Sequence, residues 1–210
     1  MPYSQFWNVR YEEISRLNDV QLTELLKRLV NLEASRFFIS PSAMSVSLNI
    51  HVSDGGQDGR VEWHAGPDRT DFIPDRFTIF QVKATEMDPS DCINELFEKQ
   101  KREKRKGSIS QKKKQLKIKI EEVLDRGGCY IIFCGREYTD SNVEKKIDGM
   151  RIALKEAGKT YWNTANLKFY SAQKIADWTN QYLSAIIFVK TIMNGTPMDG
   201  LMTWKTCLGE

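Results

Sequence analysis

Histidine and cysteine are scarce in this chain, which has two histidines and four cysteines among its 210 residues. No two cysteines are spaced as CxxC. Structural zinc sites use four clustered ligands of these two types, and disulfide frameworks carry an even set of cysteines in small secreted domains. The sequence therefore predicts neither kind of site. Cys129 and Cys134 flank an apolar run and are expected to be small buried residues.

Long apolar runs are also absent. No stretch approaches the roughly 18 uninterrupted apolar residues of a membrane-spanning helix. The first residues, MPYSQFWNVRYEE, lack the basic start and apolar block of a secretory signal. We therefore expect a cytoplasmic protein with no membrane partner. The sequence also contains no Walker loop, no dinucleotide fingerprint and no Ser–His–Asp arrangement, so it carries no motif of those nucleotide-binding and hydrolase classes.

Positive charge is distributed unevenly along the chain. The segment 99–119 is dense in lysine and arginine and has a single acid, Glu103, whereas the rest of the chain is net acidic. A basic segment of this density on an acidic body favours a polyanion as partner, although a solvated helix face has the same composition. The residues expected to contact the polyanion are Lys104, Arg105, Lys112, Lys113 and Lys114.

Hydrophobic periodicity divides the chain into helices and strands. Apolar residues at helical spacing, ended by turn residues, predict helices at 18–38, 90–106, 116–126, 140–158 and 173–190. Alternating or continuous apolar residues predict strands at 44–52, 60–65, 76–85, 129–135 and 166–172. The two strands on either side of the proline-containing loop 66–75 are expected to pair as a hairpin.

The predicted order is α-β-β-β-α-α-β-α-β-α. Helices alternate with strands in its second half, which predicts an α/β fold with a mixed central sheet flanked by helices. Apolar residues make up 40% of the chain, enough for a sizeable core. We expect residues 1–190 to form one domain. The tail 191–210 lacks periodicity and is expected to be a linker or the start of a following region.

Two polar residues interrupt the apolar strand at 76–85. Because side chains alternate along a strand, Gln81 and Lys83 share one face, where a buried ammonium needs compensation. Asp58 follows the glycine-rich turn SDGGQDG at the start of the neighbouring strand and is placed to supply it. Carboxylate and amide oxygens of this kind suit Mg²⁺ or Mn²⁺, although a structural Asp58–Lys83 ion pair without metal has the same spacing.

Other carboxylates are candidates for the same site. Glu33 continues the leucine spacing on the apolar face of the first helix, where a carboxylate needs a partner or a metal unless the helix frays there. Glu62 shares strand parity with Asp58, so it either faces the site or is a surface glutamate. Asp54, ahead of the glycine turn, is an alternative to Asp58.

The stretch DGGQDGRVEW, followed by FTIFQVKAT, resembles the PD-(D/E)XK nuclease superfamily, specifically its Mrr-like branch, in which QxK replaces (D/E)xK. The glycine-rich turn before Asp58, the short strand after it, the triplet from Gln81 to Lys83 and the α-β-β-β-α-β order all match. The resemblance covers residues 18–189 and implies a restriction-endonuclease-like core.

The resemblance also implies roles for these residues. Asp58, Gln81 and Glu33 would bind Mg²⁺ (or Mn²⁺), the carbonyl of Val82 would adjoin the metal, and Lys83 would be the catalytic lysine. The neutral Gln81 stands where most of the superfamily has an acid, which lowers the negative charge of the site. The implied activity is cleavage of double-stranded DNA with little sequence preference, with the basic segment on the phosphates.

The closing strand and helix, KFYSAQKIADWTNQYLSAIIF, are similar to those of nuclease domains that head larger anti-phage proteins, including NTPases of the STAND type. This similarity implies an antiviral effector that becomes active as a homo-oligomer and has a sensor or ATPase region in the same polypeptide. Two other hypotheses stay open: a catalytically inactive nucleic-acid-binding module of the same fold, and an RNA-directed nuclease.

Overall fold

One mixed β-sheet organises the part of the chain that this computed structural model describes, namely residues 7–46, 57–98 and 115–194. Its strands follow in chain order across the sheet. They are β1 (Met44–Val46), β2 (Gly59–Glu62), β3 (Phe77–Lys83), β4 (Cys129–Cys134) and β5 (Asn166–Tyr170). The first three are antiparallel neighbours, and β3, β4 and β5 run parallel. The predicted pairing of the strands around the proline-containing loop is confirmed by the β2–β3 ladder.

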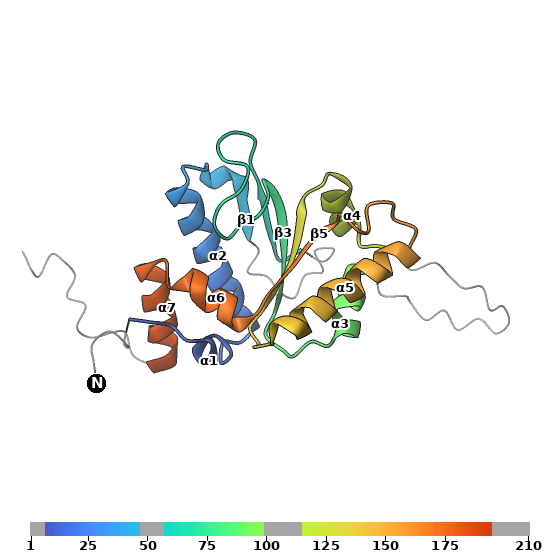
Figure 1. The fold of residues 1–210 in the computed structure, drawn as a ribbon. Helices are drawn as coiled ribbons and strands as arrows, with labels where there is room; N and C mark the ends of the chain where they lie inside the picture. Colours follow the sequence, from blue (N-terminus) through green and yellow to red (C-terminus); the bar gives the residue numbers. More distant parts are fainter. Residues whose placement is uncertain (1–6, 47–56, 99–114, 195–210) are drawn as a thin grey trace, which may run out of the picture.

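Helices cover both faces of the sheet, as Figure 1 shows. One face is covered by α1 (Tyr11–Ile14), α2 (Asp19–Arg36), α6 (Ala172–Thr179) and α7 (Leu183–Asn194). The other is covered by α3 (Pro89–Leu96), α4 (Ile118–Asp125) and α5 (Asp140–Glu156). A short 3₁₀ turn, η2 (Pro41–Ala43), leads from α2 into β1. The predicted class, an α/β fold with a mixed sheet between helices, is confirmed.

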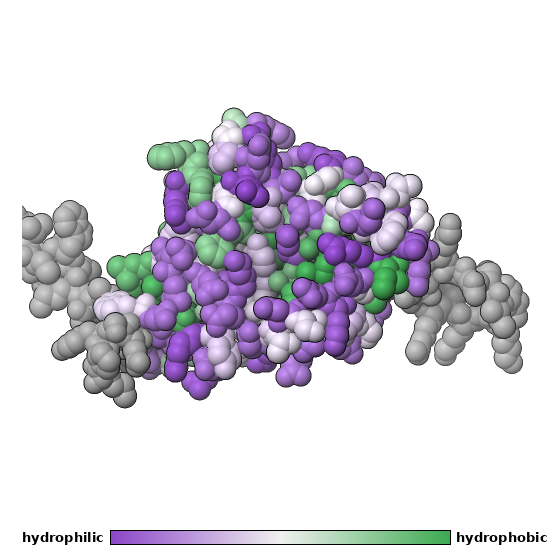
Figure 2. Space-filling model, in the orientation of Figure 1, coloured by the Kyte–Doolittle hydropathy of each residue, from purple (hydrophilic) through white to green (hydrophobic). Residues whose placement is uncertain are grey.

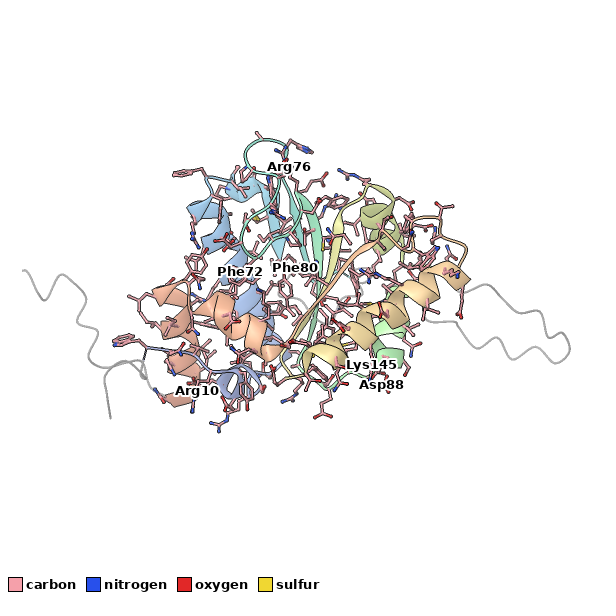
Figure 3. The ribbon with its side chains drawn as sticks, viewed as in Figure 1. Arg10, Phe72, Arg76, Phe80, Asp88 and Lys145 are labelled. Carbon is pink, nitrogen blue, oxygen red and sulfur yellow. The ribbon has the colours of Figure 1, made fainter. Side chains whose placement is uncertain are left out.

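Alternation along β3 explains why two separate hydrophobic clusters form. Phe80 and Val82 point into the cluster under α2 and α6, and Phe77 and Ile79 point into the cluster under α3, α4 and α5. Figure 3 labels Phe80 in the first of these layers, together with Phe72 from the loop after β2. Both rings lie against Trp178, with centroid separations of 6.4 and 5.4 Å. Gln81 and Lys83 share the parity of Phe77 and therefore belong to the α3–α4 face.

Several local predictions need correction. The first long helix begins where predicted, since Asn18 is the N-cap of α2 and Gln21 completes the capping box. However, α3 is capped by Asp88, which directly precedes Pro89, and therefore begins slightly ahead of the predicted start at Ser90. The helix predicted at 173–190 is two helices, α6 and α7, separated by a turn. The short α1 was not predicted, because four residues carry too little periodicity.

Glycine ends α4, as its sequence predicts. Gly127 has a φ of +74°, the left-handed conformation that side chains with a Cβ disfavour. A Cβ on Gly128 would lie 2.4 Å from the carbonyl oxygen of Phe77. The chain can therefore turn directly from α4 into β4 and keep β4 in contact with β3.

The cysteines of the described residues are buried, which leads to a prediction about their reactivity. Burial raises the pKa of the Cys92 thiol to about 12 and also raises that of Cys129 and Cys134. Because the thiolate is the reactive species, iodoacetamide at mildly alkaline pH should leave these three thiols unmodified in the folded protein and alkylate them in urea. Peptide mass spectrometry measures this, and rapid labelling of the folded protein would contradict the described core.

The surface of the described residues is mostly hydrophilic in the view of Figure 2, with smaller green patches between the purple side chains. None of the helices within the described ranges is long and apolar enough to cross a membrane. The amphipathic helices thus direct their apolar sides to the two clusters that pack on the sheet.

Candidate active site

Asp58 and Gln81 meet at the carboxyl end of β3. Asp58 immediately precedes β2, and its backbone N–H donates to the carbonyl of Phe80 at 2.8 Å. Its carboxylate oxygen Oδ2 accepts from the Gln81 side-chain amide at 2.5 Å and from the backbone N–H of Val82 at 2.7 Å. The side chain of Asp58 therefore continues the β2–β3 ladder by one step, which holds its carboxylate against Gln81.

Lys83 lies on the same face, one alternation further along β3, but its ion-pair partner is not Asp58. Its ammonium lies 2.7 Å from Oε1 of Glu95 on α3. The other oxygen of Glu95 accepts from the ammonium of Lys117 at 2.9 Å. The predicted need for a compensating carboxylate is thus met by Glu95, and a structural Asp58–Lys83 ion pair is not what the structure shows.

The electrostatics link these five side chains into one site. Burial raises the pKa of Asp58 above its ordinary value, while the Val82 N–H and the positive charges of Lys83 and Lys117 act in the opposite direction. For Glu95, burial also acts to raise the pKa, but hydrogen bonds from the two lysines outweigh it and leave the pKa below the usual value. Asp58 therefore lies within the electrostatic reach of the Lys83–Glu95–Lys117 cluster.

Gln81 presents an oxygen that the protein itself does not satisfy. The residue is 7% exposed, and its Oε1 has no hydrogen-bond partner within the described part of the chain. A buried polar atom of this kind costs free energy unless something binds it. Together with the carboxylate of Asp58, it offers the hard oxygen donors that Mg²⁺ or Mn²⁺ prefers.

The donor set fits a divalent ion that is held mainly by water and substrate. Among residues 7–46, 57–98 and 115–194, no group of three or more His, Cys, Asp and Glu side chains could hold a metal. Mg²⁺ commonly uses only one or two carboxylates and completes its shell with water and phosphate oxygens. Asp58 and Gln81 fit that pattern, with one carboxylate and one amide oxygen from the protein.

Glu33 does not join this site. It is fully buried on the other side of the sheet, where it accepts hydrogen bonds from the N–H of Phe72 (3.2 Å), the indole of Trp178 (3.0 Å) and the hydroxyl of Tyr182 (2.5 Å). The N-terminal end of α2 lies near the site, because the carboxylate of Asp19 accepts a hydrogen bond from the N–H of Ala84, directly after β3, at 2.9 Å.

The length of α2 separates Glu33 from the metal-binding candidates. Glu33 follows Asp19 by 14 positions in α2, so it is about 21 Å further along the helix axis. The prediction that a carboxylate on this apolar face needs partners is confirmed, but the partners are three hydrogen-bond donors. Its assignment as a ligand of the same metal as Asp58 does not agree with this placement.

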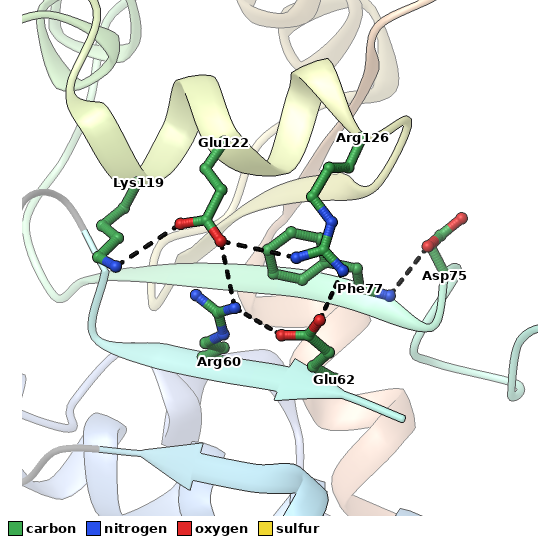
Figure 4. A network of polar contacts seen from close by, with 7 residues as sticks. All are labelled: Arg60, Glu62, Asp75, Phe77, Lys119, Glu122 and Arg126. Atoms are coloured by element: carbon green, nitrogen blue, oxygen red, sulfur yellow. Dashed lines mark hydrogen bonds and ion pairs between the residues drawn. The ribbon is translucent and has the colours of Figure 1, made fainter. Parts of the chain in front are cut away.

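Glu62 also lies outside the site, where it pairs with two arginines, as Figure 4 shows. It shares the face of Asp58 but lies at the other end of β2, opposite Phe77. Its two carboxylate oxygens each lie 2.5 Å from a guanidinium, one of Arg60 and one of Arg126. Those hydrogen bonds lower the pKa of Glu62. The network joins β2 to α4 and leaves Glu62 as a partner of arginines.

Several predicted residues lie outside the described ranges. They are Asp54 and the expected phosphate contacts Lys104, Arg105, Lys112, Lys113 and Lys114. The residues on either side of 99–114 are described: the N–H of Glu98 donates to the carbonyl of Gln115 at 2.9 Å, and Phe97 and Leu116 form a β-bridge. Positions 98 and 115 therefore lie next to each other, close to Lys117 in the chain.

Glu95 and Lys117 are the members of the site that sequence reasoning did not single out. A signal for Glu95 exists, since it follows the buried Cys92 by three positions and therefore shares the inward face of α3. Lys117 was counted only as one of many charges in the basic segment.

Comparisons of the chain with protein-family models, with curated proteins and with solved structures found no match.

Proposed function

We propose that this protein is a metal-dependent endonuclease that hydrolyses phosphodiester bonds of double-stranded DNA with low sequence specificity. One observation carries the proposal: Asp58 and Gln81 are in direct contact, and Lys83 projects beside them from the same strand face. The chain order α2-β1-β2-β3-α3-α4-β4, with α4 as an additional helix, also agrees with the α-β-β-β-α-β core order of the PD-(D/E)XK nucleases that the motif resembles.

The residues divide into two chemical roles. Asp58 and Gln81 would hold Mg²⁺ or Mn²⁺ through a carboxylate and an amide oxygen. When bound, such an ion supplies an acidic water and neutralises charge on a phosphate. Lys83 carries a positive charge at the same end of β3, where it can orient a water or stabilise the charge that develops on the phosphate oxygens.

Nucleic acid as the substrate class is supported by the charge pattern. The basic segment 99–119 would place many cations on the DNA backbone, and its described end, Lys117, belongs to the cluster at Lys83. Phosphate contacts position a duplex without reading its sequence, which supports low sequence preference. We further propose, from the resemblance, a cytoplasmic anti-phage effector that acts as a homo-oligomer and has a sensor or ATPase region in the same polypeptide.

Metal binding gives the first test, and Asp58→Asn is the variant. Loss of the carboxylate charge should weaken Mn²⁺ binding by about tenfold or more and abolish plasmid nicking, because charged oxygens dominate the attraction for the ion. Titration followed by electron paramagnetic resonance measures the binding, and a plasmid assay with Mg²⁺ or Mn²⁺ measures cleavage.

The matched control is Asp177→Asn on α6, which removes the same charge at an exposed position on the opposite face of the sheet. It should bind Mn²⁺ and cut plasmid as the unaltered protein does. Equal Mn²⁺ affinity in the Asp58 and Asp177 variants would overturn the proposed metal site. Parallel RNA substrates show which nucleic acid is cut.

The second candidate is a nucleic-acid-binding module without catalysis. The observation that favours it is the ion pair between Lys83 and Glu95, which neutralises the lysine expected to act on the phosphate. The same plasmid assay separates the two functions, because a binding module shifts the plasmid in a gel without nicking it at any concentration of Mg²⁺ or Mn²⁺.

A further inference from the structure

One carboxylate, Glu95, holds two lysines from different parts of the chain. Lys83 comes from the end of β3, and Lys117 immediately precedes α4. The position of Lys117 is set by its backbone, because its N–H donates to the carbonyl of Leu96 at 2.9 Å and the neighbouring residues form a β-bridge. The cluster is therefore built into the fold by the end of α3, and does not depend on long side chains meeting at an open surface.

The burial of the cluster separates it from ordinary surface ion pairs. The side chains of Lys83, Glu95 and Lys117 are 26, 22 and 14% exposed. A half-buried carboxylate with two ammonium groups carries a net positive charge, and that charge lies beside Asp58 and the unsatisfied oxygen of Gln81. An excess cation at a partly desolvated place favours an anionic ligand there.

We propose that Lys117 binds a phosphate of the DNA backbone next to Lys83, and that Glu95 is a positioning residue that holds both ammonium groups at the site. This inference rests on the proposed nuclease function and extends it to the residues that handle the substrate. An ammonium has three donors, and Glu95 accounts for one contact on each lysine. Both lysines therefore keep donors for phosphate oxygens while Glu95 restrains them.

The charge balance supports the assignment. With Asp58 and Glu95 ionised, the four charged side chains of the site sum to zero. A divalent cation at Asp58 would make the site positive, which matches the negative charge of a phosphodiester and of its transition state. Without Lys117 the carboxylate of Glu95 would cancel Lys83 alone, and the metal-loaded site would be less positive by one charge.

The test for Lys117 is DNA binding by Lys117→Gln. The probe is a short fluorescein-labelled duplex in Ca²⁺, followed by anisotropy over a range of salt concentrations. Affinity should fall about tenfold, and the salt dependence should fall by about one counterion, because one phosphate contact is lost. Lys117→Arg keeps the charge and should recover most of the affinity.

The control for charge is Lys174→Gln on α6, which removes one lysine from the opposite side of the sheet. It should bind the duplex as the unaltered protein does. Thermal unfolding of every variant shows whether the fold is kept. A folded Lys117→Gln protein with unchanged affinity and salt dependence would overturn the inference.

The positioning role of Glu95 predicts opposite changes in binding and cleavage. Glu95→Gln releases both ammonium groups and adds positive charge, so the duplex should bind about threefold more tightly. Cleavage should nevertheless fall about 100-fold at saturating duplex, because Lys83 is no longer held. A residue that merely stabilised the fold would weaken both properties together, and that outcome would refute the positioning role.

Failure of the inference and failure of the proposed function give different results. If the unaltered protein cuts DNA and Lys117→Gln binds and cuts equally well, the nuclease function is supported and the proposed role of Lys117 is rejected. If DNA binding depends on Lys117 but no metal supports cleavage, the phosphate site is supported and the nuclease function is rejected.

Discussion

Replacement of Lys83 by alanine is expected to reduce DNA cleavage by about 10³-fold while the duplex is still bound. Lys83 is the only one of the motif residues that carries a positive charge, and it projects beside the Asp58–Gln81 contact. In the variant, Glu95 still pairs with Lys117, so the neighbouring cluster is not left with an unpaired carboxylate. Plasmid nicking and duplex anisotropy measure the two properties on the same preparation.

The control for this prediction keeps the positive charge but changes the shape of the charged group. Lys83→Arg retains the ion pair with Glu95, yet a guanidinium is planar and larger than an ammonium. It should bind DNA normally and recover only part of the cleavage. Undiminished nicking by a folded Lys83→Ala protein would remove Lys83 from the mechanism and leave the binding module as the better proposal.

The second large effect concerns Glu33 and stability. Glu33→Ala should lower the free energy of unfolding by about 3–5 kcal/mol, because it removes the shared acceptor of two buried donors and one half-buried hydroxyl. Those donors are the N–H of Phe72, the indole of Trp178 and the hydroxyl of Tyr182. Urea titration followed by tryptophan fluorescence measures the change, and Trp178 reports on the altered surroundings directly.

Glu24→Ala on the same helix is the matched control. Glu24 forms a surface ion pair with Arg28 at 3.0 Å, and such a pair contributes about 0.5 kcal/mol or less. Glu33→Gln should keep an acceptor oxygen and lose less stability than Glu33→Ala. If folded Glu33→Gln loses Mn²⁺ binding to the degree expected of Asp58→Asn, the assignment of Glu33 to the opposite face of the sheet is wrong.

Local sequence patterns predicted the elements of the fold well. The alternation in FTIFQVK placed Gln81 and Lys83 on one face, and the structure confirms that face by the cluster that Phe77 and Ile79 enter. Asp58 was predicted at the start of the neighbouring strand, and the structure places it there, beside Gln81. These predictions succeeded because strand parity and strand boundaries depend on residues that are adjacent in the chain.

Partners distant in sequence were predicted less well. Lys83 was expected to pair with Asp58, but it pairs with Glu95, which a helix packed on the same face brings close. Helical spacing correctly placed Glu33 on the apolar side of α2, yet it could not show which face of the sheet that side covers. The connections between strands decide that, and periodicity within one helix contains no information about them.

By itself, the sequence determined the order of the five strands, the α/β class, the shared face of Gln81 and Lys83, and the need for Glu33 to find partners. Only the tertiary structure decided who those partners are. It placed Trp178 and Tyr182 around Glu33, and it brought Glu95 and Lys117 to Lys83. The reason is physical: the side-chain periodicity of one strand or helix follows from chain neighbours, whereas ion pairs between elements depend on how hydrophobic faces pack.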